Sequence, residues 1–155
     1  MSPATKNKCS ILVLLSLGFS LLRMPTETVC VEVKDQHLCL RVLREKTDQK
    51  RGFQLVENLY PNEGLLYILS DQKKPNFWMK DVIQHLDIVF IDDHGHVLET
   101  VHAHPHRSDV ITPPTNTMYA IELLGGRAEQ LNLVKGSKLL LNIISEPNGA
   151  LLAWD

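Results

Sequence analysis

The stretch "LDIVFID", residues 86–92, decides the fold of this chain. Its β-branched and aromatic residues favour a β-strand that is buried on both faces. The segment "DDHG", residues 92–95, is a turn signal, and "HVLETVHA", residues 96–103, has the composition of a partner strand. These three segments predict an antiparallel hairpin in the best-packed part of the protein.

Other short strand-like segments surround this hairpin, together with two short helical ones. The predicted strands are "VCVEV" (29–33), "HLCLRVL" (37–43), "LLYIL" (65–69), "TMYAIELL" (117–124) and "KLLLNIIS" (138–145). One helix is expected to begin near Thr47, and the other lies in "GGRAEQLNL", residues 125–133. This order predicts an α+β fold with a mainly antiparallel, barrel-like or strongly curled β-sheet and one or two short helices.

Composition restricts the class of protein. The chain has 155 residues, of which 44% are hydrophobic and 22% charged, as in a soluble globular domain. The net charge is −2 and no basic block is present. Because phosphate binding needs clustered lysine and arginine, nucleic acid is not expected as a partner.

The N-terminus differs in character from the rest of the chain. Lys6 and Lys8 precede an uncharged apolar run, residues 9–22. The run is shorter than the ~20 residues of a spanning helix but suits the core of a signal peptide. We therefore expect residues 1–28 to be a signal peptide or N-terminal anchor and residues 29–155 to be a single globular domain. The alternative is an ordinary buried helix of the fold. Export predicts a periplasmic or extracellular location, with membrane contact only through an uncleaved leader.

Cys30 and Cys39 lie on either side of the polar turn of the first predicted hairpin. In an oxidising compartment, cysteines that face each other across a hairpin can form a disulfide, if the register brings their Cα atoms within about 6 Å. The alternatives are two buried thiols or a catalytic cysteine. The last is disfavoured because no partner base lies near either cysteine in the sequence.

The motif "FWMKD", residues 77–81, places charges beside large apolar residues. We identify Arg51, Trp78, Lys80, Asp81 and Asp87 as a candidate ligand-binding set. The indole of Trp78 would be a flat wall for a sugar, while Arg51 and Lys80 would suit a carboxylate. In the alternative interpretation, Lys80 forms an ion pair with Asp87 or Asp81 that fixes the entry into the following strand, and Trp78 fills the core.

Five of the seven histidines lie in "HGHVLETVHAHPH", residues 94–106. His96, His102 and His104 are separated by even numbers of residues, so a continuous strand places them on one face. With the aspartates of the turn, they form a candidate site for zinc, copper or nickel. The alternatives are solvated histidines on an exposed strand, or a group that senses pH near 6 as the imidazoles become charged.

Several blocks of this sequence resemble a known family, the domain of unknown function 192. The blocks are "KRGFQLVENLYPNEGLLYIL" (50–69), "FWMKD" (77–81), "LDIVFIDDHGHV" (86–97), "YAIELLGG" (119–126) and "LVKGSKL" (133–139). They occur in the order typical of that family, and the resemblance covers about residues 29–145. It implies the fold and an exported location, and it brings no established activity.

Two positions depart from the family pattern. The family usually has Gly-Leu-Met where this chain has Gly52-Phe53-Gln54, and it has asparagine where this chain has Asp81. If the asparagine is a hydrogen-bonding anchor, Asp81 keeps the acceptor and loses the donor.

Motifs of common enzyme classes are absent from the sequence. It has no Gly-x-Ser-x-Gly, no glycine-rich phosphate loop and no His-Glu-x-x-His, and no pair of acids can be chosen as acid and base. We therefore expect an exported, non-catalytic domain without a cofactor that binds a small polar molecule near "FWMKD". One alternative is a metal-binding protein, with a metal-dependent hydrolase as one form of it, that binds a divalent ion such as zinc through the segment His94–His106. The other is an interaction module that binds an envelope protein.

Overall fold

The structure is a computed structural model that describes residues 27–69, 75–139 and 142–145. Nearly all of the predicted leader, residues 1–26 with Cys9, lies outside the described residues, so export remains a prediction. Within the described ranges, no helix has the length and apolar character needed to cross a membrane.

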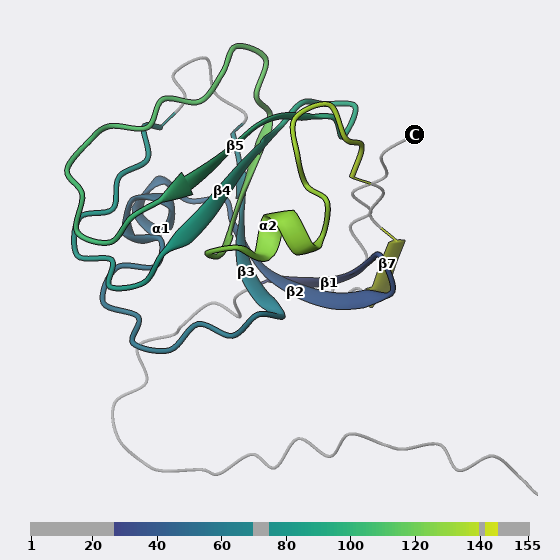
Figure 1. Ribbon diagram of the computed structural model, residues 1–155, viewed down its shortest axis with the longest axis horizontal. Coiled ribbons are helices and arrows are strands. Elements are labelled where there is room, and N and C mark those ends of the chain that lie inside the picture. Colours follow the sequence, from purple (N-terminus) through teal and green to yellow (C-terminus); the bar gives the residue numbers. More distant parts are fainter. Residues whose placement is uncertain (1–26, 70–74, 140–141, 146–155) are drawn as a thin grey trace, which may run out of the picture.

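Seven strands and two short helices make up the described part of the chain (Figure 1). The strands are β1 (Thr28–Val33), β2 (Gln36–Leu43), β3 (Glu63–Ile68), β4 (Leu86–Ile91), β5 (Val97–Ala103), β6 (Tyr119–Leu124) and β7 (Asn142–Ser145), and the helices are α1 (Lys46–Arg51) and α2 (Arg127–Gln130). The strands form one sheet in the order β5-β4-β6-β3-β2-β1-β7. The predicted combination of a mainly antiparallel sheet with two short helices is confirmed.

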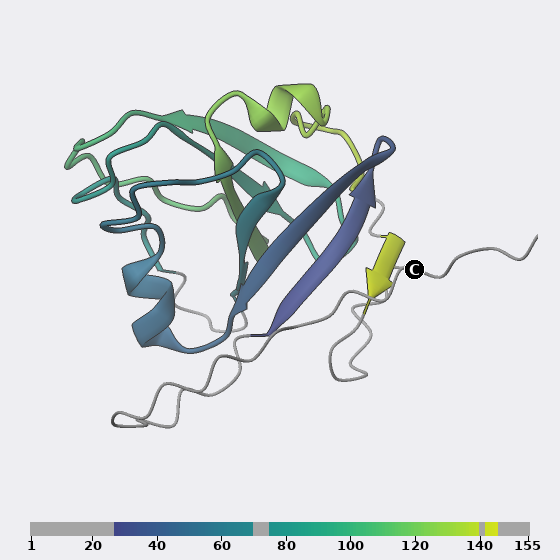
Figure 2. The same ribbon diagram turned by 90° about the horizontal axis from the view of Figure 1, so that it is seen from below.

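The sheet is strongly twisted but is not closed into a barrel. Its two ends are β5 and β7, and no ladder joins them in the described residues. Strands β1 and β2 run at a large angle to β4 and β5 in both views (Figures 1 and 2). All neighbouring strands are antiparallel except β2 and β3, which are parallel. A parallel pair needs a crossover connection, and the segment that contains α1 makes this crossover.

Strand β4 is buried along its whole length, including Asp87, as its β-branched and aromatic residues predict. It lies between β5 and β6 and pairs with both in antiparallel register. Alternate side chains of a strand point to opposite faces, so β4 contributes to two cores. Ile88 and Phe90 pack in the core on the α1 side, whereas Val89 and Ile91 pack with Ala128 in the core on the α2 side. The sheet thus separates two faces, each covered by one helix and its flanking loops (Figure 2).

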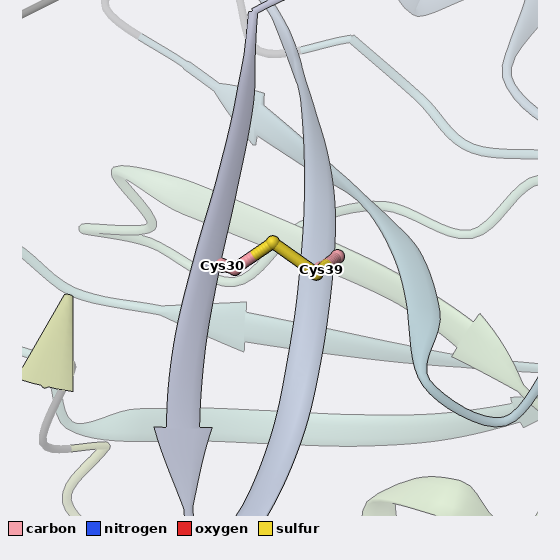
Figure 3. Close-up of a disulfide and its surroundings, with 2 residues drawn as sticks. All are labelled: Cys30 and Cys39. Atoms are coloured by element: carbon pink, nitrogen blue, oxygen red, sulfur yellow. A yellow bond between two sulfur atoms is a disulfide. The ribbon is translucent and has the colours of Figure 1, made fainter. Parts of the chain in front are cut away.

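Cys30 and Cys39 occupy directly opposite positions in the β1–β2 hairpin. Their Cα atoms are 4.0 Å apart, and the two sulfurs form a disulfide (Figure 3). Val29, Val31 and Val33 alternate with Cys30 along β1 and are buried, so the disulfide lies on the outer face of the hairpin. This register favours a disulfide over two free thiols, because directly opposite residues of a hairpin have their Cβ atoms close together.

Candidate functional site

The five residues of the predicted ligand-binding set lie in different parts of the structure. Arg51 and Trp78 line one cavity on the α1 side of the sheet, and Trp78 is 43% exposed at its rim. Lys80 and Asp81 are exposed on a turn and do not line this cavity. Asp87 is buried and faces the α2 side, where it contacts the backbone N–H of Ala128. The five residues therefore do not form one pocket.

The alternative interpretation, an ion pair of Lys80, is not what the structure shows either. Among the ion pairs of the described residues, none joins Lys80 to Asp81 or Asp87. Asp81 has a positive φ of 60°, a conformation that asparagine and aspartate tolerate better than most residues. Its carbonyl oxygen accepts a hydrogen bond from the N–H of Leu55 at 2.9 Å. The backbone therefore explains why either asparagine or aspartate suits this position.

The base of the cavity is a buried pair that the sequence analysis missed, Tyr67 and Glu122. The Tyr67 hydroxyl donates a hydrogen bond of 2.8 Å to Oε2 of Glu122. Tyr67 comes from β3 and Glu122 from β6, and only 2% and 5% of their surfaces are exposed. The signal in the sequence was the single acid in the apolar strand "YAIELL", residues 119–124.

Burial controls the protonation of this pair. It raises the pKa of the Glu122 carboxyl from its ordinary 4.5 to about 7, and the hydrogen bond from Tyr67 offsets only part of this shift. Burial and the neighbouring carboxyl also raise the pKa of Tyr67 well above its ordinary value. At neutral pH, Glu122 is therefore divided between its neutral and ionised forms, while Tyr67 keeps its proton. The cavity presents a group that can either donate or accept a hydrogen bond.

The Arg51–Gly52 step passes directly over this buried pair. A Cβ atom at Gly52 would lie 2.6 Å from the Tyr67 hydroxyl and 3.3 Å from Oε2 of Glu122. Gly52 has a φ of +48° and a ψ of −131°, a backbone conformation that residues other than glycine rarely adopt. The glycine that ends α1 thus lets the backbone approach the Glu122 carboxyl.

The cavity has a volume of about 40 Å³ and opens to solvent. The residues that decide its chemistry are Arg51, Gly52, Tyr67, Asn76, Trp78 and Glu122. A water molecule needs roughly 10–15 Å³ of such space, so the cavity holds a few waters or the end of a small polar group. The exposed face of Trp78 extends this hollow outward.

Three of the seven histidines gather at a second place, on the other side of the sheet. His102 and His104 come together as predicted, but His96 does not join them. His96 lies at the turn of the hairpin, where its ring contacts Asp92 at 3.2 Å. The third member is His85, just before β4, which lies outside the segment singled out in the sequence. One ligand atom from each of His85, His102 and His104 lies within 4.8 Å of the others.

Comparisons with known proteins agree on the fold. A search of curated proteins found no match. A putative transcription regulator from Sinorhizobium meliloti 1021 has a similar structure, with a TM-score of 0.65 and 22% identity over 75% of this chain and 93% of that one. A protein of unknown function from Novosphingobium aromaticivorans DSM 12444 gives a TM-score of 0.64 and 20% identity over 80% and 91% of the two chains. At these identities the likeness concerns the fold alone.

The family comparison covers most of the domain. The model of the family DUF192, described as "Uncharacterized ACR", matches residues 29–141. This range includes the Arg51–Gly52 step, the motif "FWMKD", all of β4 and the strand that carries Glu122. The chain therefore belongs to the DUF192 family, as the order of its sequence blocks predicted.

Proposed function

We propose that this protein is an exported, non-catalytic domain that binds a small, uncharged, hydroxyl-bearing molecule of the sugar class at the cavity above Glu122. One observation carries the proposal: a buried carboxyl, with its pKa raised to about 7, forms the base of a cavity that is open to solvent. A buried carboxyl without a role would be costly to keep, because burying a polar group costs free energy that an apolar side chain would not.

The charges around the cavity define the class of ligand. Glu122 at the base disfavours an anion when it is ionised, since two negative charges in a buried site repel each other strongly. Lys50 and Arg51 at the mouth disfavour a cation. A carboxylate ligand is also less favoured than the sequence suggested, because Lys80 does not line the cavity. An uncharged polar molecule meets neither repulsion.

Hydrogen bonding and stacking favour the same class. The carboxyl of Glu122 can accept a hydrogen bond from a hydroxyl group or donate one to it, depending on its protonation. Trp78 at the rim offers an aromatic face of the kind that packs against the apolar C–H face of a sugar. The small volume admits only one end of such a ligand, so the rest of it would lie against Trp78.

The lining of the cavity supports binding rather than catalysis. Glu122 is the only carboxyl among the residues that the structure describes around this cavity. Hydrolysis of a glycoside by the usual route needs two carboxyl groups about 5–9.5 Å apart across the bond that breaks. The disulfide between Cys30 and Cys39 supports the exported location, because disulfides persist in oxidising compartments.

A ligand screen tests the proposal. In the full chain with Trp154→Phe, Trp78 is the sole tryptophan, so its fluorescence reports on the rim of the cavity. Monosaccharides and polyols are titrated beside small carboxylates and amines, and affinities are then measured by calorimetry. We expect uncharged hydroxylated compounds to change the fluorescence, and Glu122→Gln to weaken their binding by about tenfold or more, the effect of losing a charge-assisted hydrogen bond.

Lys80→Met is the matched control, because it removes a nearby charge that does not line the cavity. We expect this variant to bind like the parent. The proposal fails if no uncharged compound produces a response, or if Lys80→Met abolishes the response as completely as Glu122→Gln does.

A further inference from the structure

We infer that His85, His102 and His104 form a binding site for a divalent transition-metal ion of the zinc class. The site lies on the α2 face of the sheet, opposite the face that carries the Glu122 cavity. It does not depend on the proposed ligand-binding function.

The pairing of β4 with β5 creates the cluster. Asp87 lies directly opposite His102, and Leu86 lies opposite Ala103. One residue further, this register brings His85 beside His104, and their ring centroids are 4.9 Å apart. Alternate residues of an extended chain share a face, so His85, just before β4, and Asp87 face the same side as His102 and His104, which lies just after β5. The three histidines and Asp87 therefore lie in two adjacent pairs, His85 beside His104 and Asp87 beside His102.

A glycine just after β6, the strand on the other side of β4, leaves space for the rings. Gly125 follows β6, and its N–H donates a hydrogen bond of 2.8 Å to the carbonyl oxygen of His85. A Cβ atom at Gly125 would lie 2.6 Å from Cβ of His85 and 3.0 Å from Cε1 of His102. The rings of His85 and His102 stack beside this position, with an angle of 19° between their planes. The absence of a side chain at Gly125 therefore permits the two imidazoles to lie side by side.

The separations suit a shared ion after a small movement. Zinc binds imidazole nitrogens at about 2.0–2.1 Å, so nitrogens at tetrahedral positions lie about 3.4 Å apart. The three ligand atoms lie within 4.8 Å of one another. The largest separation would have to shrink by at most about 1.4 Å for tetrahedral zinc coordination. All three histidines are exposed, so their rings can rotate without displacing core residues.

The Asp87 carboxylate determines which ring nitrogen of His102 is available to bind a metal. Oδ1 of Asp87 lies 2.7 Å from Nδ1 of His102, and Oδ2 accepts the N–H of Ala128 at 2.8 Å. A carboxylate can only accept hydrogen bonds, so Nδ1 of His102 carries the proton. The lone pair of a neutral His102 is then on Nε2, where it is available for a metal. Histidine ligands of metals usually have such a carboxylate partner on their other nitrogen.

The ligand set selects the class of metal. Three imidazoles without a thiolate suit zinc, copper, nickel and cobalt, whereas magnesium and calcium prefer oxygen ligands. Three protein ligands leave at least one coordination position for water or another molecule. A groove of about 660 Å³, lined by Asp87, His102, Glu129 and Lys135 among others, begins beside the cluster. A group bound in this groove would have access to the open position.

Calorimetric titration of Zn²⁺, repeated with Co²⁺ and optical spectroscopy, tests the site. The full chain is used without a histidine tag and with Cys9→Ser, which removes a thiol that could compete for the ion. We expect one ion per chain, with the absorption of tetrahedral or five-coordinate Co²⁺. His85→Ala should abolish this binding, and Asp87→Asn, which keeps the shape of the side chain, should weaken it by about 10–100-fold.

The matched control is the double variant His94→Ala with His96→Ala. It removes two exposed imidazoles at the other end of the same hairpin, near Asp92 and Asp93. We expect it to bind Zn²⁺ like the parent, and thermal melting monitored by circular dichroism should show that all variants are folded. Equal losses of binding in His85→Ala and in the control would overturn the inference. So would the absence of one-to-one binding in the parent, since either result would mean that surface histidines bind the ion only adventitiously.

Discussion

The buried carboxyl of Glu122 should make the stability of this protein fall as the pH rises. Its pKa is about 7 in the folded state against an ordinary value of 4.5, because burial disfavours the charged form. Between these two values the folded protein holds a proton that the unfolded chain releases. Protons therefore stabilise the folded state, and the stabilisation is complete below pH 4.5 and is lost as the pH rises through 7.

The size of the effect follows from the shift. A difference of about 2.5 pKa units corresponds to about 3 kcal/mol in the free energy of unfolding, at 1.36 kcal/mol for each unit. Stability should fall most steeply between pH 5 and 7, by up to about 1.4 kcal/mol for each pH unit. For a domain whose total stability is about 5–15 kcal/mol, this is a large fraction.

Glu122→Gln isolates this contribution from every other titrating group. The amide does not ionise, and its oxygen can still accept the hydrogen bond from Tyr67. Urea unfolding of both proteins at pH 4.5, 5.5, 6.5 and 7.5 gives two stability curves. Any contribution that both proteins share cancels in the difference. We expect Glu122→Gln to gain about 2–3 kcal/mol relative to the parent between the lowest and highest pH. Parallel curves would refute the reasoning, because they would mean that Glu122 has the same pKa in the folded and unfolded states.

Two further predictions concern the backbone above Glu122 and the first hairpin. Gly52→Ala should lower the free energy of unfolding more than Gly126→Ala, because both glycines have positive φ but only Gly52 has the Tyr67 hydroxyl within 3 Å of a new Cβ. Backbone strain costs of order 1–3 kcal/mol for alanine at Gly126, which has φ 84° and ψ −6° in the left-handed helical region. Gly52, with φ 48° and ψ −131°, lies outside that region, so the difference between the two variants in urea unfolding measures its additional backbone strain and its steric contact together, and equal losses would contradict the prediction. Replacing Cys30 and Cys39 by serine should cost about 2.5 kcal/mol, the entropy of closing a loop of this length, with the melting temperature as the measurement. A melting temperature unchanged by this replacement would show that the hairpin turn alone constrains the unfolded chain.

The sequence predicted the strands because their signals are local. The β-branched and aromatic residues of β4 and the turn at residues 92–95 are read from consecutive residues, and the structure has both. The parallel pairing of β2 with β3 could not be read in the same way. It depends on how the segment with α1 crosses the sheet. The residues of two strands do not by themselves indicate whether the strands pair in parallel or antiparallel.

The candidate site was harder to predict because its residues are far apart in the chain. Arg51 and Trp78 were identified from their residue types, and both line the cavity. Glu122 was missed, because a single acid in a strand gives no indication of its partner until β3 and β6 are paired. His85 was missed for the same reason, since its proximity to His104 depends on the register of β4 with β5.

The register of β4 with β6 explains why the two candidate sites are separate. Asp87 pairs with Leu123, and Glu122 pairs with Ile88, so the two acids occupy adjacent rows of the same pair of strands. Adjacent rows point to opposite faces, which places Asp87 with the histidines under α2 and Glu122 with Tyr67 under the end of α1. A shift of one residue would place both acids on one face, where their charges would repel each other. The observed register gives each acid its own partner, so a failed test at either site would leave the argument for the other intact.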